Sequence, residues 1–322
     1  MVKANAYGTG AVEVTRALET VDPWGYGVVT VEEGAVLRAA GIRRPIVVFG
    51  PVSAAGVDAC RRDDLRPTLG DLDALRRWLA AGDRPFHVEI DSGMGRLGFP
   101  WRDREAIAEA GKLLAHATGW EGIFTHFHSA DVDPVATREQ WRRFTEVLGA
   151  LPRRPALVHA ANSAAALGGL GLDADLVRPG IFLYGGQAGA AVPEAVVRFR
   201  APVVATRRLA AGDSVSYGAS WRASRPTTIA TVAVGYADGM PRALGGRGRV
   251  ELQGRACPIA GRVTMDFTMV DAGDLAVSAG DVATLFGGAV SLDAQAAAAG
   301  TISYELLTGL GSRVQRRYGE AG

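Results

Sequence analysis

A lysine near the amino end lies in a sequence context that is typical of a reactive amine. Lys3 follows a short apolar start and precedes a turn punctuated by Gly8 and Gly10, after which residues 11–18 have a helical pattern. We expect Lys3 at the end of a strand, because parallel β/α folds place reactive groups in the loops that follow strands. An amine there can form a Schiff base with a carbonyl cofactor. Taken alone, Lys3 would be an ordinary solvated lysine.

Two later segments combine a hydroxyl, a glycine and an arginine. Ser163 opens a short helical run and is a candidate N-cap, and Arg178 ends an apolar segment two residues before Gly180. A helix N-terminus with a hydroxyl beside an exposed backbone N–H is a ready anion site. Alone, Ser163 would be a helix cap, but together with Lys3 and Gly180 it predicts a phosphate site.

The elements that must position these residues alternate between strand and helix over the first 180 residues, which is typical of a parallel β/α fold. We expect strands at Lys3 and at residues 25–29, 45–49, 65–69, 86–90, 122–126, 156–160 and 175–178. We expect helices at residues 31–40, 54–62, 72–81, 102–117 and 135–148. Eight strands favour a (β/α)8 TIM-type barrel over a doubly wound sheet.

The pattern changes near residue 200. Strand-like runs at 200–204, 228–234 and 248–252 are separated by turn signals with little helix between them, and only residues 301–318 look helical again. We therefore predict two domains, a barrel over residues 1–200 and a mostly β C-terminal domain over residues 201–322.

Composition narrows the possible partners. The 322 residues are 48% hydrophobic and 21% charged, which supports a large core, and 35 basic against 34 acidic residues give a net charge of +1. This balance favours neither nucleic acid nor an anionic membrane as a partner. Cys60 and Cys257 lie far apart without metal-ligand spacing, so we expect no disulfide framework and no metal. Without a signal peptide pattern or a transmembrane-length apolar run, we expect a cytoplasmic protein.

The segment Lys3–Gly10, Lys-Ala-Asn-Ala-Tyr-Gly-Thr-Gly, resembles the cofactor-lysine motif of the alanine racemases, pyridoxal 5′-phosphate (PLP) enzymes built on a (β/α)8 barrel. Further segments resemble the same family at 91–98, 159–163, 178–181, 234–242, 261–266 and 301–314, in the family's order. Thr9 departs from the usual histidine. The family also carries a few dozen residues before the lysine, so we expect either an upstream start or a shortened amino end.

The resemblance implies a set of site residues. The residues implied to bind the cofactor are Lys3, Tyr7, Arg96, His126, Asn162, Ser163, Arg178, Gly180, Ile181 and Tyr304. Arg96, Thr264 and Met265 are implied to contact the substrate, the last two from the other subunit. Arg178 matches the arginine that faces the pyridine nitrogen. Because an arginine keeps its protons, the ring becomes a weaker electron sink, which favours rapid reprotonation over side reactions.

Glu89 is a second departure. Family members commonly have a carbamylated lysine here, whose negative charge holds the arginine that matches Arg96. A glutamate supplies that charge directly but is shorter, so we expect a different or water-mediated contact and no dependence on carbon dioxide.

The resemblance implies a two-base racemase that interconverts L-alanine and D-alanine as a homodimer with shared active sites. Lys3 serves one face of the substrate and Tyr236 of the partner subunit the other, although a phenol needs positive neighbours to act as a base near neutrality. Three alternatives stay open: a racemase for serine or another small amino acid, a non-catalytic PLP-binding protein, and an inactive paralogue. The second lacks a β domain, and the third would not need every proton-transfer residue that is present here.

Overall fold

The computed structural model describes residues 1–82 and 84–319 and divides the chain into two compact units. The first unit comprises Met1–Ala6, Gly10–Gly180 and Ala188–Ala191, and the second comprises Tyr7–Thr9, Ile181–Gln187 and the chain from Val192 onward. The predicted domain limit at residue 200 stays a prediction.

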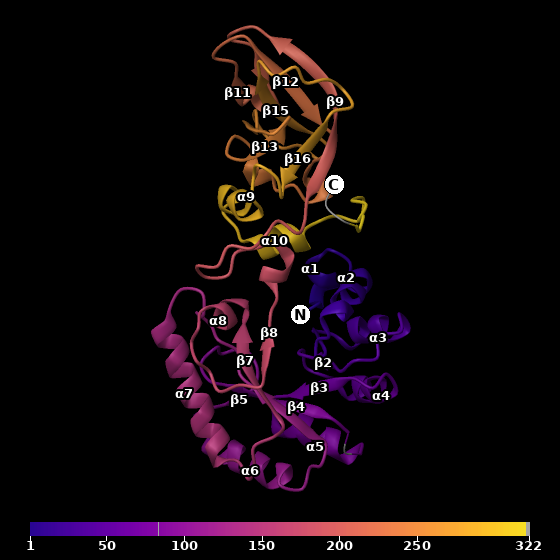
Figure 1. Ribbon diagram of the computed structural model, residues 1–322, viewed down its shortest axis with the longest axis vertical. Helices are drawn as coiled ribbons and strands as arrows, with labels where there is room; N and C mark the ends of the chain where they lie inside the picture. The colour runs from indigo at the N-terminus through magenta and orange to yellow at the C-terminus, as the bar shows by residue number, and fades with distance from the viewer. Residues whose placement is uncertain (83, 320–322) are drawn as a thin grey trace. The chain divides into compact units, whose positions relative to one another are not determined.

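The first unit is built on a parallel sheet that follows the chain order (Figure 1). Its strands are β1 (Tyr26–Val28), β2 (Ile46–Val48), β3 (Arg66–Leu69), β4 (Phe86–Asp91), β6 (Trp120–Phe124), β7 (Leu157–Asn162) and β8 (Leu176–Arg178), with β5 (Phe99–Pro100) paired to β4. All these pairings are parallel. Seven of the predicted strands are confirmed, each within a few residues of its expected limits.

The predicted strand at Lys3 is wrong. The Val2 N–H donates to the Gly27 carbonyl of β1 at 2.9 Å, and the Met1 amino group donates to the Pro179 carbonyl just after β8, also at 2.9 Å. Two residues therefore bridge β1 and the end of β8 where a strand was expected, and the ring is nearly closed. Lys3 then begins the short helix α1 (Lys3–Tyr7).

The helix α1 is left-handed. Ala4, Asn5 and Ala6 have φ of 53°, 54° and 51°, a conformation that costs non-glycine residues about 1–2 kcal/mol each. Two side chains support it: a Glu33 carboxylate oxygen accepts the Ala4 N–H at 2.6 Å, and Asn5 Oδ1 accepts the N–H of Ala11 at 2.8 Å. The turn therefore depends on a residue about thirty positions away, which no local pattern shows.

Helices lie outside the strands of the first unit (Figure 1). They are α2 (Ala11–Leu18), α3 (Val31–Ala39), α4 (Ala54–Arg62), α5 (Leu72–Ala80), α6 (Arg104–Leu114), α7 (Pro134–Ala150) and α8 (Ser163–Leu167), with the 3-10 helix η1 (Glu19–Val21) after α2. Side-chain oxygens of Thr30, Ser53, Asp71, Asp103 and Asp133 cap α3 to α7, because each accepts an otherwise unpaired first-turn N–H. The predicted helices at these positions are confirmed.

The core of the first unit lies between these helices and the strands. Leu37 of α3, Leu75 of α5 and Leu114 of α6 are fully buried, as are Phe86 at the start of β4 and Trp120 at the start of β6. Burying a side chain of this size contributes about 1.5–3 kcal/mol, so this packing fixes where the strands end and where their polar residues lie.

The second unit is antiparallel. Its main sheet has the order β14 (Arg255–Pro258), β13 (Arg249–Leu252), β16 (Val282–Phe286), β9 (Phe199–Leu209), β12 (Thr227–Val232) and β15 (Thr268–Gly273). Smaller elements are the ribbon β10 (Ser214–Val215) with β11 (Trp221–Arg222) and the 3-10 helices η2 (Ile181–Tyr184), η3 (Tyr217–Ala219), η4 (Tyr236–Asp238) and η5 (Arg242–Leu244). A bridge between Ile259 and Val270 links the two edges of the sheet. The predicted mostly β character is confirmed.

Two helices follow the last strand, α9 (Leu292–Ala299) and α10 (Ser303–Thr308). The predicted helix over residues 301–318 is correct only for α10. The chain leaves the helix at Gly309, and the Gly311 N–H donates to the Asp238 carbonyl at 3.1 Å instead of continuing a helical pattern. A tertiary hydrogen bond therefore ends this helix early.

Candidate active site

The amine of Lys3 lies in a positively charged, half-buried environment of the first unit. Burial lowers its pKa, the charges of Arg96 and Arg178 lower it further, and only Glu33 acts in the opposite direction. A depressed pKa increases the neutral fraction of the amine, which is the form that attacks a carbonyl and accepts a proton. Glu33 also accepts the N–H groups of Val29 and Thr30, at 2.8 and 3.2 Å, so one carboxylate joins the lysine turn to the loop before α3.

Arg178, the last residue of β8, is held by several acceptors. Its Nη1 donates to His159 Nδ1 at 2.8 Å, and its Nη2 donates to the carbonyls of Thr125 and Ala160 at 3.0 Å each. The guanidinium carbon lies 5.2 Å from the ring centre of Phe124. The Nε–H has no acceptor among the described residues, so one donor of a firmly positioned cation is left for a ligand.

His126 lies next to this arginine. Its Nδ1 is 3.3 Å from Arg178 Nη2, and burial, with the charges of Arg178, Arg96 and Lys3, lowers its pKa to about 3. Because an arginine can only donate, the neutral imidazole accepts at Nδ1 and carries its proton on Nε2. His126 is therefore a neutral neighbour of the arginine.

Glu89 of β4 is buried near two arginines but makes no direct ion pair among the described residues. Burial raises the pKa of its carboxyl to about 7, against the opposing charges of Arg96 and Arg178. Its neighbour Arg96 is exposed in the loop after β4. The expected hold of Glu89 on Arg96 is therefore electrostatic in this structure, without a hydrogen bond between them.

The predicted phosphate residues of the first unit meet at the ends of β7 and β8. Asn162, and not Ser163 as predicted, is the N-cap of α8, because its Oδ1 accepts the Ala165 N–H at 3.0 Å. The freed Ser163 hydroxyl accepts the Gly180 N–H at 2.8 Å. Its own proton has no acceptor within the described residues, so this hydroxyl can donate to an anion.

The remaining predicted residues belong to the second unit. Tyr7 is buried and stacks on Tyr184 with ring centres 4.5 Å apart, while the ring centre of Tyr304 is 5.8 Å away. Burial raises the pKa of Tyr7 well above that of a free phenol, so its hydroxyl stays protonated and can donate. Ile181 is buried at the start of η2. Sequence reasoning missed Tyr184, since an aromatic in a short apolar run carries no distinguishing signal.

Tyr236, Thr264 and Met265 lie on two neighbouring loops. The Tyr236 N–H donates to the Thr264 carbonyl at 3.0 Å, and the Ala237 N–H donates to the Met265 carbonyl at 3.1 Å. A Cβ at Gly235 would lie only 2.2 Å from the Met265 carbonyl oxygen, so only glycine permits this approach. The structure thus brings together the three residues predicted to act on a partner's substrate.

An arginine that sequence reasoning did not single out ties these loops. Arg313 Nε donates to Asp238 Oδ1 at 3.0 Å and its Nη1 donates to Asp266 Oδ1 at 2.9 Å. Asp238 also accepts the Gly235 N–H at 2.9 Å. The signal in the sequence is the arginine of the closing segment, whose role could not be inferred without its two partners.

Within residues 1–82 and 84–319, no group of three or more histidine, cysteine or acidic side chains is arranged to hold a metal ion. The same residues form no helix with the length and apolar character needed to cross a membrane.

A parallel β/α ring with a half-buried lysine and a fixed arginine at its strand ends, joined to an antiparallel β unit, defines the barrel class of PLP-dependent enzymes. Family models for the alanine racemase N-terminal and C-terminal domains match residues 1–188 and 196–318. The chain belongs to the alanine racemase family, which is PLP-dependent. The predicted family, fold class and cofactor are confirmed.

Individual relatives agree with this assignment. The chain is 40% identical to an alanine racemase of Acidiphilium cryptum, over 98% of this chain and 90% of that protein, and 38% identical to one of Sorangium cellulosum, over 99% and 91%. The structure resembles that of the biosynthetic alanine racemase from Pseudomonas aeruginosa, with a TM-score of 0.90, 37% identity, and coverage of 99% of this chain and 91% of that one.

Proposed function

We propose that this chain interconverts L-alanine and D-alanine, with Lys3 and Tyr236 of the partner subunit moving the proton. The observation that carries the proposal is the half-buried Lys3 amine, whose pKa is lowered by burial beside two arginines. The curated relatives are alanine racemases, which favours alanine over serine and over a non-catalytic role.

The residues of the first unit fit PLP. When bound, PLP supplies a carbonyl for an amine and a conjugated ring that withdraws electron density from the α-carbon of an amino acid. Lys3 supplies the amine, Arg178 an unpaired Nε–H for the ring nitrogen, and Ser163 a hydroxyl donor for the phosphate. The assignments of Asn162, Gly180 and His126, and of Tyr7, Ile181 and Tyr304 in the second unit, remain part of the proposal.

Arg178 influences the course of the reaction without giving up a proton. Burial lowers its pKa to about 10, against the charge of Glu89, so the guanidinium stays charged at neutral pH. A donor that keeps its proton leaves the ring nitrogen unprotonated, and electron density stays near the α-carbon. The amine of Lys3 then takes or returns the proton on one face. The hydroxyl of Tyr236 of the partner subunit does so on the other.

The exposure of the tyrosine loop supports a homodimer with shared sites. Tyr236, Met265 and Phe267 are 44%, 53% and 44% exposed, which places an aromatic and apolar surface on the loops that carry the second base. Such surfaces mark interaction sites more often than isolated exposed residues do. We propose that a second copy covers them and receives Thr264 and Met265 beside its substrate. A cytoplasmic location belongs to the same proposal and is tested by cell fractionation.

Mixing two inactive variants tests the shared site. Lys3→Ala homodimers should be inactive and Tyr236→Phe homodimers nearly so, but a heterodimer would contain one site with both bases intact. Random exchange of subunits in a two-fold dimer would restore about a quarter of the sites. Activity is followed by loss of the α-proton signal of L-alanine in D2O and by a chiral assay for D-alanine. No recovery despite demonstrated subunit exchange would contradict the shared site.

A further inference from the structure

Arg178 is the first of a line of polar side chains that continues through His159 and His87 to Glu121. His159 of β7 contacts Arg178 through Nδ1 at 2.8 Å and His87 of β4 through Nε2, again at 2.8 Å. His87 Nε2 lies 3.3 Å from an oxygen of Glu121 on β6. His87 and His159 are 0% and 2% exposed, so water does not compete for these contacts. Nothing in the proposed reaction uses His87 or Glu121.

Only one arrangement of protons satisfies every contact in this line. Arg178 can only donate, so His159 Nδ1 is unprotonated and the ring of His159 carries its proton on Nε2. That Nε2–H donates to Nδ1 of His87, which must then be unprotonated, so His87 also carries its proton on Nε2. The last N–H therefore points at Glu121, which accepts it as a carboxylate. Burial lowers the pKa of both histidines, which agrees with two neutral rings.

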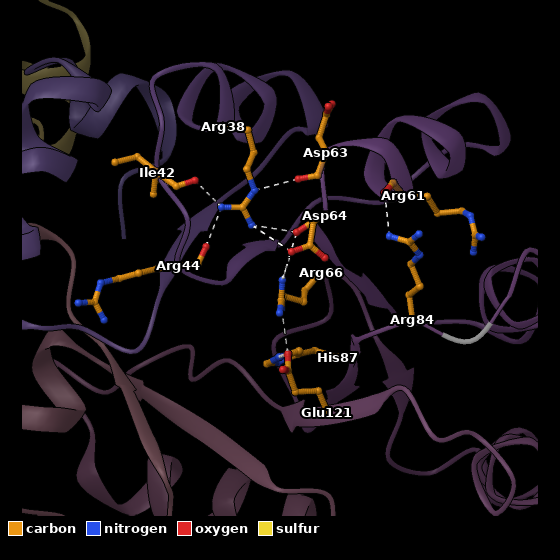
Figure 2. A network of polar contacts seen from close by, with 10 residues as sticks. All are labelled: Arg38, Ile42, Arg44, Arg61, Asp63, Asp64, Arg66, Arg84, His87 and Glu121. Atoms are coloured by element: carbon orange, nitrogen blue, oxygen red, sulfur yellow. Dashed lines mark hydrogen bonds and ion pairs between the residues drawn. The ribbon is translucent and has the colours of Figure 1, made fainter.

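Glu121 is kept ionised at its end of the line. Burial acts to raise the pKa of its carboxyl, but the hydrogen bond from His87 and the charge of Arg66 outweigh it, and the net shift is downward. Figure 2 shows Arg66 between this carboxylate and Asp64, with Nε of Arg66 3.3 Å from Glu121 and its Nη1 3.3 Å from an Asp64 oxygen. The Glu121 carboxylate is therefore held in place by its ion pair with Arg66.

We propose that Glu121 is a positioning residue for Arg178 that acts through His87 and His159. Its carboxylate fixes both imidazoles in the tautomer with the proton on Nε2, so that His159 presents an unprotonated Nδ1 to the guanidinium. The inference rests on the proposed function only in that Arg178 serves the cofactor. If His159 carried its proton on Nδ1, two donors would face each other at 2.8 Å and the arginine would have to move. The carboxylate favours one direction because it can accept but cannot donate.

The tautomers can be measured directly. The chain has five histidines, so protein labelled with 15N-histidine gives few imidazole signals, and single histidine substitutions assign them. We expect His87 and His159 to be neutral with the proton on Nε2 in the wild-type protein, with and without PLP. A proton on Nδ1 of His159 would overturn the proposal without any variant. This readout does not involve alanine, so it stands even if the proposed reaction fails.

Two substitutions separate positioning from packing. Glu121→Ala removes the acceptor, and we expect a mixture of tautomers at His87 and a kcat for alanine lower by about fivefold to tenfold, with KM nearly unchanged. In Glu121→Gln, Arg66 Nε can only donate, so it holds the amide oxygen at the position that His87 Nε2 also faces. This variant should therefore restore both the tautomers and most of kcat. The matched control is Glu109→Ala, which removes exposed ion pairs with Arg76 and Lys112 and should change neither.

Each contrary result has a defined meaning. Unchanged tautomers in Glu121→Ala, or changed tautomers with an unchanged kcat, would overturn the positioning role. A Glu121→Gln protein with the proton of His87 on Nδ1 would also overturn it, even if the alanine variant fails to fold. A fall in kcat that tracks only a fall in melting temperature, equally in both variants, would show a structural role alone.

Discussion

The two proposed bases are held in opposite ways. Lys3 lies among buried and charged side chains, on a turn that Glu33 supports through the Ala4 N–H, and its pKa is shifted by burial and by neighbouring cations. Tyr236 is 44% exposed, and its loop is fixed by backbone hydrogen bonds to Thr264 and Met265. Its side chain has no partner among the described residues.

This difference indicates which half of the chemistry each region can complete alone. The first unit already contains the charges that lower the pKa of the Lys3 amine and, in Arg178, the donor that we propose for the cofactor. The second unit fixes the backbone of the loop that carries Tyr236, and none of the described residues forms a hydrogen bond with its hydroxyl. In the proposed shared site, the second copy would supply the contacts of that hydroxyl.

Removing each base in turn should give the largest effects and separate the two regions. Lys3→Ala should lose both turnover and the visible absorbance of covalently bound PLP. Tyr236→Phe should lose about 10²–10⁴-fold in turnover while keeping that absorbance, because it removes a proton carrier and not the cofactor's attachment. Absorbance spectra and the chiral assay measure both. A Tyr236→Phe protein that racemises normally would remove the tyrosine from the mechanism.

Loosening the lysine turn should affect stability as well as activity. Glu33→Gln weakens the charge-assisted hydrogen bonds to Ala4 and Val29, so we expect a loss of about 1–3 kcal/mol in the free energy of unfolding and a lower kcat. Urea unfolding measures the first. Glu32→Gln, an exposed change on the same helix, is the control and should be nearly neutral. Equal stability of the two variants would mean that the left-handed turn needs no such support.

Glu89 should give the first unit a pH dependence of stability. Its folded pKa is raised by burial to about 7 from an ordinary value of 4.5, so the folded state binds more protons between these limits. Its contribution is therefore fully present below about pH 4.5 and is lost as pH rises to about 7. We expect Glu89→Gln to lack this decline when urea unfolding is compared at pH 5 and pH 8.

Parallel stability curves for the wild-type and Glu89→Gln proteins would show that Glu89 does not titrate in this range. Activity in buffer freed of carbon dioxide gives a separate measurement, and we expect it to be unchanged, because the carboxylate needs no carbamylation.

Arg313 should have the smallest effect, on the second region only. Its ion pairs with Asp238 and Asp266 are partly exposed, so Arg313→Gln should cost at most about 1 kcal/mol of stability. We expect a larger relative change in kcat, because Arg313 no longer links the loop of Asp238 to the loop of Asp266. Arg317→Gln, a nearby exposed arginine, is the control. A normal kcat for Arg313→Gln would show that the backbone hydrogen bonds alone position the tyrosine.

Much of the first unit was predictable because its signals are local. The strands alternate with capped helices, and the polar residues at their ends, such as Arg178 and Asn162, follow directly from that pattern. The strand predicted at Lys3 was wrong, because this residue begins the left-handed turn. A left-handed turn of non-glycine residues is intrinsically unfavourable, and its support from Glu33 is a contact distant in the sequence.

The amino-acid sequence by itself determined the family, the order of the elements and the types of residue available for proton transfer, because these depend on motifs and short-range patterns. Only the tertiary structure decided the pKa shifts, the cap of α8 and the line from Arg178 to Glu121. These depend on burial and on hydrogen bonds between β4, β6, β7 and β8, and the sequence does not specify which side chains of these strands come within hydrogen-bonding distance of one another.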